Sequence, residues 1–374
     1  MKDILTLSEI SPLAGQTLGN AYTVVKEANA PEGILVRAFE MKDYELAKSV
    51  KIIARAGAGV NNIPLDRYAG EGVIVCNTPG ANSNGVKELT ILALLLCGRD
   101  VFNGIQWTQG LKDGETTVEQ QVEKGKKSYV GTEIMGKTLG LIGFGEIGRK
   151  VAESAHCLGM DIVFVDPFYT AQVPSWAKQV QTNEEVFAVA DIITVHVPLL
   201  DATRGFINEK SIALMKDGAC VVNIARGELV DSDAMLKNLD SGKIKRYVTD
   251  FPSAKLVGHK KVVTIPHLGA STFESEDNCA VMAARQIKNF LEKGDIINSV
   301  NYPNIAFENK GKIAVVLFKA SAKDAVESFA SKQKTNKYEI KVRKDYGAAK
   351  IDFIDNIPVK ELESVSGVIK VLTI

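Results

Sequence analysis

Short apolar runs alternate with stretches of helical spacing along most of the chain. Within the first hundred or so residues, the runs Gly33–Val36, Lys51–Ala54 and Val73–Val75 have the length and β-branched content of buried strands. Ser83–Cys97 repeats apolar residues at helical spacing, which predicts a helix with a strongly apolar face. Residues 108–128 are polar without a clear period, so we expect an exposed arm or loop there. This pattern predicts a small α/β domain followed by an arm.

The same alternation continues from Thr138 to about His267. Strands separated by helical stretches predict a doubly wound parallel sheet. The strands are expected at Leu139–Gly143, Ile162–Asp166, Ile192–Val197, Cys220–Ile224, Arg246–Asp250 and Val262–Ile265. Thr272–Lys293 then predicts one long helix.

The last part of the chain has a different order of elements. Strands are expected at Lys312–Phe318, Tyr338–Arg343, Ala348–Ile354 and Val368–Thr373, with helices at Ser321–Gln333 and Val359–Val365. The resulting order β-α-β-β-α-β is that of the ferredoxin-like arrangement. We therefore expect a small third domain after the long helix.

Composition narrows the class of protein. The 374 residues carry 45 Lys and Arg and 45 Asp and Glu, and this neutral balance argues against nucleic acid as a partner. The longest apolar run, Leu89–Cys97, is too short to cross a membrane, and Met1–Leu5 lacks the pattern of a signal peptide. The five cysteines are scattered without a C-x-x-C spacing, which favours buried thiols over a metal site. We expect a cytoplasmic protein without a metal.

The segment Gly143–Gly148, with the sequence GFGEIG, joins a predicted strand to a predicted helix. Gly143 allows the tight turn, Gly145 allows a pyrophosphate to approach the backbone, and Gly148 allows close packing of helix and strand. The free N–H groups at the start of the helix attract phosphate. Asp166, at the end of the next strand, can accept hydrogen bonds from both ribose hydroxyls and repels a 2′-phosphate. The segment therefore predicts an NAD site.

Two side chains that suit oxidation of a 2-hydroxy acid follow strands of this sheet. Arg226 follows the fourth strand and His267 the sixth, where ligands of such sheets bind. A guanidinium fork suits a carboxylate, and a histidine suits transfer of the hydroxyl proton. A surface arginine in a turn and a histidine bonded to backbone are the alternatives. His196 also ends a strand, and with Pro198 shaping the loop we expect it to line the nucleotide cleft.

Three segments carry a family resemblance. Gly136–Gly148, Asn223–Asp231 and Pro266–Thr272 resemble the D-isomer-specific 2-hydroxyacid dehydrogenase family. The resemblance covers about residues 35–303. It implies NAD-dependent oxidation of 3-phospho-D-glycerate to 3-phosphohydroxypyruvate in serine biosynthesis, by a homodimer.

The resemblance also implies a three-domain α/β architecture. A flavodoxin-like substrate or lid domain is expected at residues 1–101, completed by about 271–303. A Rossmann NAD domain is expected at 102–270, and a small ferredoxin-like, ACT-like domain with a regulatory or structural role at 304–374.

The resemblance assigns roles residue by residue. Arg226 would hold the substrate carboxylate and carbonyl oxygen, and His267 would be the acid–base group. Arg55 would bind the distal phosphate, aided by backbone N–H groups near Gly57 and Gly59; without the resemblance, Arg55 could equally be a solvated charge. The implied cofactor contacts are Gly143, Gly145, Glu146, Ile147, Gly148, Asp166, His196, Pro198, Thr203, Ile224, Arg226, Asp250, His267 and Gly269.

Two departures from the family pattern leave alternatives open. Ala254 stands where the family has a glutamate beside the histidine, and Asp250, Asp231 or Glu228 are the candidate replacements. The loop Phe318–Ser321 lacks the Pro/Gly-rich turn of serine-binding regulatory domains.

A dehydrogenase for another D-2-hydroxy acid, such as glycerate or glyoxylate, is one alternative function. A catalytically silent NAD-sensing module is the other.

Overall fold

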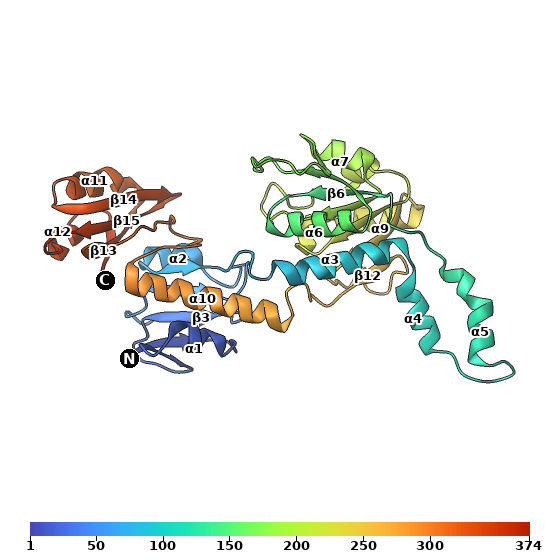
Figure 1. The fold of residues 1–374 in the computed structure, drawn as a ribbon, viewed down its shortest axis with the longest axis horizontal. Helices are drawn as coiled ribbons and strands as arrows, with labels where there is room; N and C mark the ends of the chain where they lie inside the picture. The colour runs from blue at the N-terminus through green and yellow to red at the C-terminus, as the bar shows by residue number, and fades with distance from the viewer. The chain divides into compact units, whose positions relative to one another are not determined.

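The computed structural model describes residues 1–374, which form two compact units (Figure 1). One unit comprises Met1–Asn82 with Phe273–Ile374, and the other comprises Ser83–Thr272. The predicted boundary at residue 101 would have left the helix Ser83–Gly98 (α3) with the first unit, whereas its contacts assign it to the second.

The first unit begins with a five-stranded parallel sheet in the order β2-β1-β3-β4-β5. This is the flavodoxin-like order. Its strands are β1 (Lys2–Thr6), β2 (Tyr22–Val25), β3 (Gly33–Val36), β4 (Ile52–Arg55) and β5 (Ile74–Cys76), with short helices α1 (Leu13–Leu18) and α2 (Leu65–Gly70). The sequence did not predict β1 and β2, because polar residues interrupt their apolar runs.

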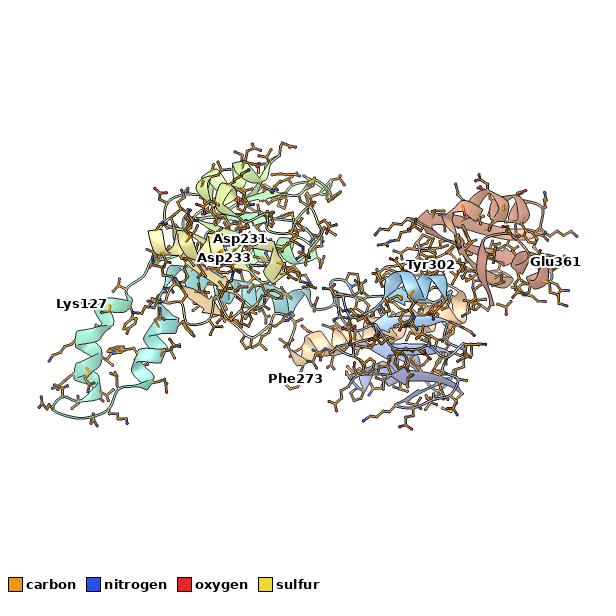
Figure 2. All side chains as sticks on the ribbon, turned by 180° about the vertical axis from the view of Figure 1, so that it is seen from behind. Lys127, Asp231, Asp233, Phe273, Tyr302 and Glu361 are labelled. Atoms are coloured by element: carbon orange, nitrogen blue, oxygen red, sulfur yellow. The ribbon has the colours of Figure 1, made fainter.

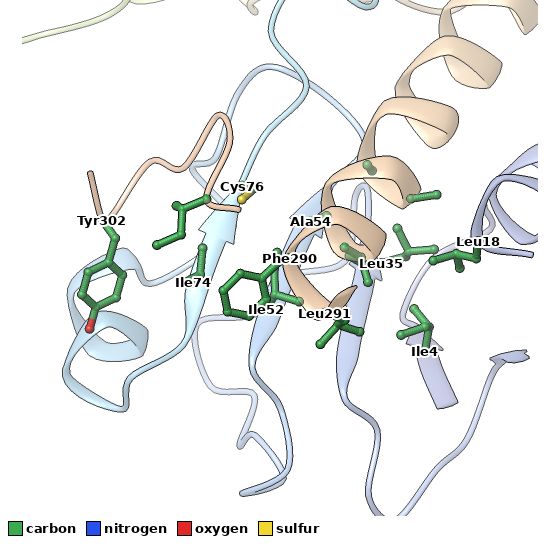
Figure 3. Packing of buried hydrophobic residues seen from close by; sticks show 14 of the residues in the cluster. Ile4, Leu18, Leu35, Ile52, Ala54, Ile74, Cys76, Phe290, Leu291 and Tyr302 are labelled. Atoms are coloured by element: carbon green, nitrogen blue, oxygen red, sulfur yellow. The ribbon is translucent and has the colours of Figure 1, made fainter. Parts of the chain in front are cut away.

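One long helix, α10 (Phe273–Lys293), supplies much of this unit's core. Figure 3 shows α10 lying over the sheet, where Phe290 and Leu291 pack with residues of β3 and β4. Small residues on the helix, including Ala283 and Ala284, are fully buried and allow close approach to the strands.

The chain then forms a four-stranded antiparallel sheet in the order β14-β15-β13-β16. Its elements are β13 (Lys312–Lys319), α11 (Lys323–Ser331), β14 (Thr335–Arg343), β15 (Tyr346–Phe353), α12 (Val359–Glu363) and β16 (Val368–Thr373), with a 3-10 turn at Ala320–Ala322 (η3). This is the β-α-β-β-α-β order that the sequence predicts.

Both faces of the two central strands of that sheet, β13 and β15, are buried. On β13, Val315 and Leu317 join the core of α10 and the parallel sheet, whereas Val316 and Phe318 pack in the cluster that includes α11 and α12. Because side chains alternate along a strand, one strand serves two cores. The small domain is therefore attached to the rest of its unit by a continuous hydrophobic core.

The second unit contains a seven-stranded parallel sheet in the order β12-β11-β10-β9-β6-β7-β8. Its strands are β6 (Thr138–Ile142), β7 (Asp161–Val165), β8 (Ala177–Gln179), β9 (Ile192–Val195), β10 (Ala219–Asn223), β11 (Ile244–Thr249) and β12 (Val262–Thr264). The helices are α6 (Glu146–Cys157), α7 (Asn183–Val189), α8 (Glu209–Ala213) and α9 (Ser232–Ser241), with a 3-10 turn at Gly227–Leu229 (η2). The order confirms the predicted Rossmann-type sheet. The edge strand β8 was not predicted because it is short and polar.

Two short helices project from the second unit, and the second of them lies within the arm predicted at residues 108–128 (Figures 1 and 2). They are α4 (Val101–Gln109) and α5 (Val118–Gly125), followed by a 3-10 turn at Lys126–Tyr129 (η1). Neither α4 nor α5 has a buried residue, although Trp107 and Tyr129 stack with ring centroids 5.2 Å apart. None of the helices has both the length and the apolar content needed to span a bilayer.

Candidate active site

The glycine loop after β6 leaves open space beside one of its three glycines. Gly143 has φ +95°, and a Cβ there would lie 2.6 Å from the carbonyl oxygen of His196. A Cβ at Gly148 would collide with the carbonyl oxygen of Gly143, so only glycine permits this approach of helix and loop. A Cβ at Gly145 would meet nothing within 4 Å. The space beside Gly145, next to the start of α6, is available to a ligand.

The side chains of the loop are arranged around α6. Glu146 is ion-paired with Arg149 at 2.7 Å and with Lys150 at 3.2 Å. The hydrogen bond from Lys150, with the two positive charges, lowers the pKa of the Glu146 carboxyl despite the opposing effect of burial. Ile147 packs against the core beneath the loop. The acidic residue is thus neutralised locally and leaves a net positive charge on the first turns of the helix.

Asp166 follows β7 directly, at the end of the strand beside the glycine loop. Its Oδ2 accepts a hydrogen bond from the Phe144 N–H at 2.8 Å, and its Oδ1 accepts one from the Phe168 N–H at 2.9 Å. Each carboxylate oxygen retains a further lone pair. The backbone therefore holds the carboxylate in one orientation while leaving it able to accept two hydroxyl hydrogen bonds.

The loop after β9 is fixed by local hydrogen bonds. Burial lowers the pKa of His196 to about 4, and one ring nitrogen, Nε2, lies 3.0 Å from Thr194 Oγ1. His196 is therefore neutral at physiological pH and unsuited to proton exchange. The Thr203 hydroxyl donates to the Pro198 carbonyl oxygen at 2.7 Å and accepts from the Leu200 N–H. Pro198 and Thr203 thus shape the loop in this structure.

Arg226 is held by a buried asparagine at the end of β10. Asn223 Oδ1 accepts from the Arg226 N–H at 3.3 Å, and Asn223 Nδ2 donates to the Arg226 carbonyl oxygen at 2.7 Å. The Thr249 hydroxyl on β11 donates to the Asn223 carbonyl oxygen at 2.8 Å. Arg226 Nη1 bonds only the Ala225 carbonyl oxygen, at 2.6 Å. The rest of its guanidinium fork is available to a ligand.

His267 and Asp250 meet across the ends of β11 and β12. The Asp250 carbonyl oxygen accepts from the His267 N–H at 2.9 Å, and Asp250 Oδ2 accepts from the Gly269 N–H at 3.1 Å. The other carboxylate oxygen, Oδ1, is buried without a hydrogen-bond partner. Burial raises the pKa of Asp250, although the Gly269 N–H and the charges of His267 and Arg226 oppose this. Ile224 packs beside Gly269.

No carboxylate hydrogen-bonds to the His267 imidazole. Ala254 is exposed in a turn. Asp231 caps α9 by accepting from the Asp233 and Ala234 N–H groups. The Asp250 side chain bonds Gly269, and Glu228 is exposed. The ring instead contacts Phe251, with centroids 4.7 Å apart.

Arg55 ends β4 in the first unit. Its Nε donates to Asn62 Oδ1 at 3.1 Å, and its guanidinium lies over Gly57, where any Cβ would collide with it. The Gly57 N–H already donates to Thr78 Oγ1 at 2.7 Å. Gly59 is half-buried in the same loop. The structure therefore keeps Arg55 close to this loop, with the Gly57 N–H engaged internally.

Sequence reasoning missed the supporting residues Asn223, Thr249 and Phe251. Asn223 and Thr249 are fully buried polar residues at the ends of apolar strands, which is the available signal, since buried polar groups need partners. Nothing in the sequence distinguishes Phe251 from an ordinary core aromatic.

The second unit is similar in sequence to a known protein family. Residues 103–269 match the family described as "D-isomer specific 2-hydroxyacid dehydrogenase, NAD binding domain". The chain is 35% identical to D-3-phosphoglycerate dehydrogenase of Sus scrofa over 288 residues, covering 74% of this chain and 52% of that protein. It therefore spans about half the length of that relative.

Another relative and a solved structure are covered more fully. Hydroxypyruvate reductase of Thermotoga maritima is 38% identical, with 67% of this chain and 80% of that protein covered. The NAD⁺-bound 3-phosphoglycerate dehydrogenase of Entamoeba histolytica is 28% identical and superimposes with a TM-score of 0.63. That match covers 80% of this chain and 98% of the other.

Proposed function

The chain belongs to the D-isomer-specific 2-hydroxyacid dehydrogenase family, and we propose that it oxidises 3-phospho-D-glycerate to 3-phosphohydroxypyruvate with NAD. The observation that carries the proposal is the grouping of Arg226, Asp250 and His267 at the carboxyl ends of β10, β11 and β12. In parallel sheets this is the edge at which ligands bind.

The residues around the glycine loop fit NAD. Gly145 leaves room for the pyrophosphate at the start of α6, and Asp166 has acceptor capacity for the ribose hydroxyls. The unpartnered Asp250 Oδ1 suits the N–H of a carboxamide, because a buried acceptor without a partner is costly. When bound, NAD supplies the hydride acceptor for the reaction.

The protein's own groups handle the carboxylate and the proton. Arg226 binds the substrate carboxylate through its free guanidinium N–H groups and polarises the forming carbonyl. His267 accepts the hydroxyl proton as the C2 hydrogen leaves with its electron pair, and returns the proton in the reverse reaction. The step balances because the alcohol loses one proton from its hydroxyl group and one hydride from C2.

The assay that tests this function uses the full chain. Purified protein is supplied with NAD and either 3-phospho-D-glycerate or D-glycerate, and with NADH and either hydroxypyruvate or glyoxylate. We expect the highest kcat/KM with the phosphorylated substrates. Preference for hydroxypyruvate would favour the reductase alternative, which the relative from Thermotoga maritima supports. Absence of turnover with NAD tightly bound would favour the NAD-sensing alternative.

Arg55 carries the proposed specificity for phosphate. Arg55→Ala should raise KM for 3-phospho-D-glycerate much more than for D-glycerate, because a charge-assisted hydrogen bond contributes about 1.5–3 kcal/mol. Arg67→Ala is the matched control, since Arg67 is an exposed arginine of the same unit paired with Glu71. Equal losses on both substrates would contradict this assignment of Arg55.

We also infer a homodimer, as the family resemblance implies. The arm supports this proposal, because α4 and α5 have no buried residue and Val101 and Ile105 expose apolar side chains. Sedimentation equilibrium should give twice the mass of the chain. Deletion of residues 111–128 should shift the equilibrium toward the monomer, whereas a wild-type monomer would contradict the proposal.

For the ACT-like domain we propose a structural role. Its first loop is closed by packing of Ala322 against Gly367, and the Lys319 N–H donates to the Gly367 carbonyl oxygen. Serine at micromolar concentration should leave the initial rate unchanged. Inhibition in that range would instead support a regulatory role.

A further inference from the structure

The imidazole of His267 has an aromatic neighbour where an acid was expected. The ring of Phe251 lies 4.7 Å from the imidazole, centroid to centroid, with 48° between the ring planes. Neither ring nitrogen of His267 has a hydrogen-bond partner in the chain. The contact with Phe251 is therefore a side-chain interaction that can restrain this ring.

The backbone of His267 leaves only the side chain free to turn. His267 has φ +37°, a conformation rare outside glycine, and its N–H donates to the carbonyl oxygens of Asp250 and Ile265. Strained backbone of this kind persists only where the surroundings fix it. The backbone therefore fixes the direction of the Cα–Cβ bond of His267. Rotation of the side chain about that bond is restrained by the groups that pack against the imidazole.

Phe251 is itself well anchored. Its N–H donates to Thr249 Oγ1 at 3.1 Å, and that hydroxyl donates to the Asn223 carbonyl oxygen. On the other side, a Cβ at Gly227 would lie 3.1 Å from the Phe251 Cβ. Because Asn223 also fixes the backbone of Arg226, Phe251 is attached to the same scaffold as the proposed carboxylate-binding arginine.

We propose that Phe251 is the positioning residue of His267. Its ring orients the imidazole in place of a hydrogen-bonded carboxylate. This inference rests on the proposed function of His267 as the proton acceptor. The edge or face of the phenyl ring holds the imidazole in one rotamer. An aromatic ring also attracts a cation, so it stabilises the imidazolium that forms as the substrate is oxidised.

Two charged groups accompany this contact. Asp250 follows β11 beside His267, and Arg226 follows β10. The charges of His267 and Arg226 lower the pKa of Asp250, against the larger effect of burial. Asp250 Oδ2 accepts from the Gly269 N–H and Arg226 Nη1 donates to the Ala225 carbonyl oxygen, so neither side chain hydrogen-bonds to the imidazole. A merely structural Phe251 would lower stability when truncated but leave kcat per folded molecule unchanged.

The kinetic test compares two variants of Phe251. Phe251→Leu keeps apolar bulk and removes the ring, whereas Phe251→Tyr keeps the ring. We expect Phe251→Leu to lower kcat for the 2-hydroxy acid about tenfold, on the order of 1.4 kcal/mol, with KM changed less than about twofold. Phe251→Tyr should restore kcat. Phe329→Leu is the control, because Phe329 is a half-buried phenylalanine of the C-terminal sheet domain that packs on apolar neighbours.

A second measurement needs no substrate. The His267 ring protons, identified by comparison with the spectrum of His267→Gln, should carry a ring-current shift from Phe251. This shift should be lost in Phe251→Leu and kept in Phe251→Tyr and Phe329→Leu. The proposal is overturned if the His267 resonances are unchanged in Phe251→Leu, if that variant keeps the wild-type kcat, or if both Phe251 variants lose kcat equally. If the wild type turns over no hydroxy acid, the proposed function fails while the NMR comparison still decides the contact.

Discussion

At the scale of single residues, Asp250 combines burial with an incomplete set of hydrogen bonds. It is 1% exposed, and only one carboxylate oxygen has a partner. We predict that Asp250→Asn stabilises the ligand-free protein at neutral pH, because an amide presents an oxygen to the Gly269 N–H without a buried charge. The gain should be about 1–3 kcal/mol. The same variant should bind NAD more weakly.

The pH dependence of that gain follows from the direction of the pKa shift. Burial raises the pKa of Asp250 in the folded state, so the folded protein holds this proton more tightly than the unfolded chain. Asp250 therefore costs stability as pH rises above its unfolded pKa of about 3.9 through the folded value. Thermal unfolding of both proteins across pH should show the gain at neutral pH and its loss in acid. A gain that persists unchanged in acid would contradict this explanation.

Asp166 gives a second prediction, on cofactor choice. Its carboxylate is fixed by two backbone N–H groups and would repel a 2′-phosphate. We expect kcat/KM for NAD to exceed that for NADP by at least about tenfold, roughly 1.4 kcal/mol. Asp166→Ala should narrow the ratio, whereas Asp161→Ala, at the exposed start of the same strand, should preserve it. Comparable kcat/KM values for the two cofactors in the wild type would be inconsistent with this role.

Residue identity made part of the site predictable. Gly143, Gly145 and Gly148 occur at a spacing with a specific geometric use, and the structure gives each a matching environment. The sequence could not predict that Phe251 contacts His267, because an aromatic contact across two strand ends depends on register and side-chain rotamer. It also could not show that the Gly57 N–H bonds Thr78, since that bond joins separate loops.

At the scale of elements, two glycines in the turn from β6 into α6 have different surroundings, which allows ligand binding and folding to be tested separately. A Cβ at Gly145 would meet open space, whereas one at Gly148 would collide with the Gly143 carbonyl oxygen. We predict that Gly145→Ala keeps the wild-type unfolding midpoint but weakens NAD binding. Gly148→Ala should lower the midpoint as well, because loop or helix must move. Calorimetry of both variants, with and without NAD, measures this. Equal losses of stability in Gly145→Ala and Gly148→Ala would contradict the proposal that Gly145 serves ligand binding and Gly148 serves folding.

Periodicity predicted long elements better than edges. Every central strand of the seven-stranded sheet was predicted within a few residues, because strands buried on both faces are continuous apolar runs. Edge strand β8 and the first strands β1 and β2 are short or partly polar and carry no such run. The helices of the arm were missed because they bury no apolar face, which is the signal that periodicity measures.

At the scale of the whole molecule, a buried lysine joins the small antiparallel domain to its unit. Lys350 on β15 is 0% exposed, with Nζ 2.5 Å from Asp295 Oδ1 and 4.4 Å from the centroid of the Phe307 ring. We predict that Lys350→Ala lowers the free energy of unfolding by about 3–5 kcal/mol, because it leaves the Asp295 carboxylate without its partner. The double variant Lys350→Met with Asp295→Leu should recover much of that loss. Denaturant unfolding measures both, and a near-neutral Lys350→Ala would show that the pair does not hold this junction.

The order of domains along the chain was more predictable than their attachment. Strand and helix order alone predicted the β-α-β-β-α-β domain. That Val315 and Leu317 would face the α10 core could not be predicted, since both faces of β13 are equally apolar. When both faces of a strand are hydrophobic, the sequence predicts burial without saying which partner lies on which side.

His267 is the proposed acceptor of the substrate proton in an NAD-dependent oxidation. The most direct test is the rate of NADH formation from 3-phospho-D-glycerate by His267→Gln. The control is His259→Gln, which changes a histidine paired with Asp240 on the surface. We predict that His267→Gln lowers kcat by about 10²–10⁴ while the dissociation constant for NAD changes little, and that kcat of His259→Gln stays near the wild-type value. A His267→Gln enzyme that turns over at the wild-type rate would contradict it.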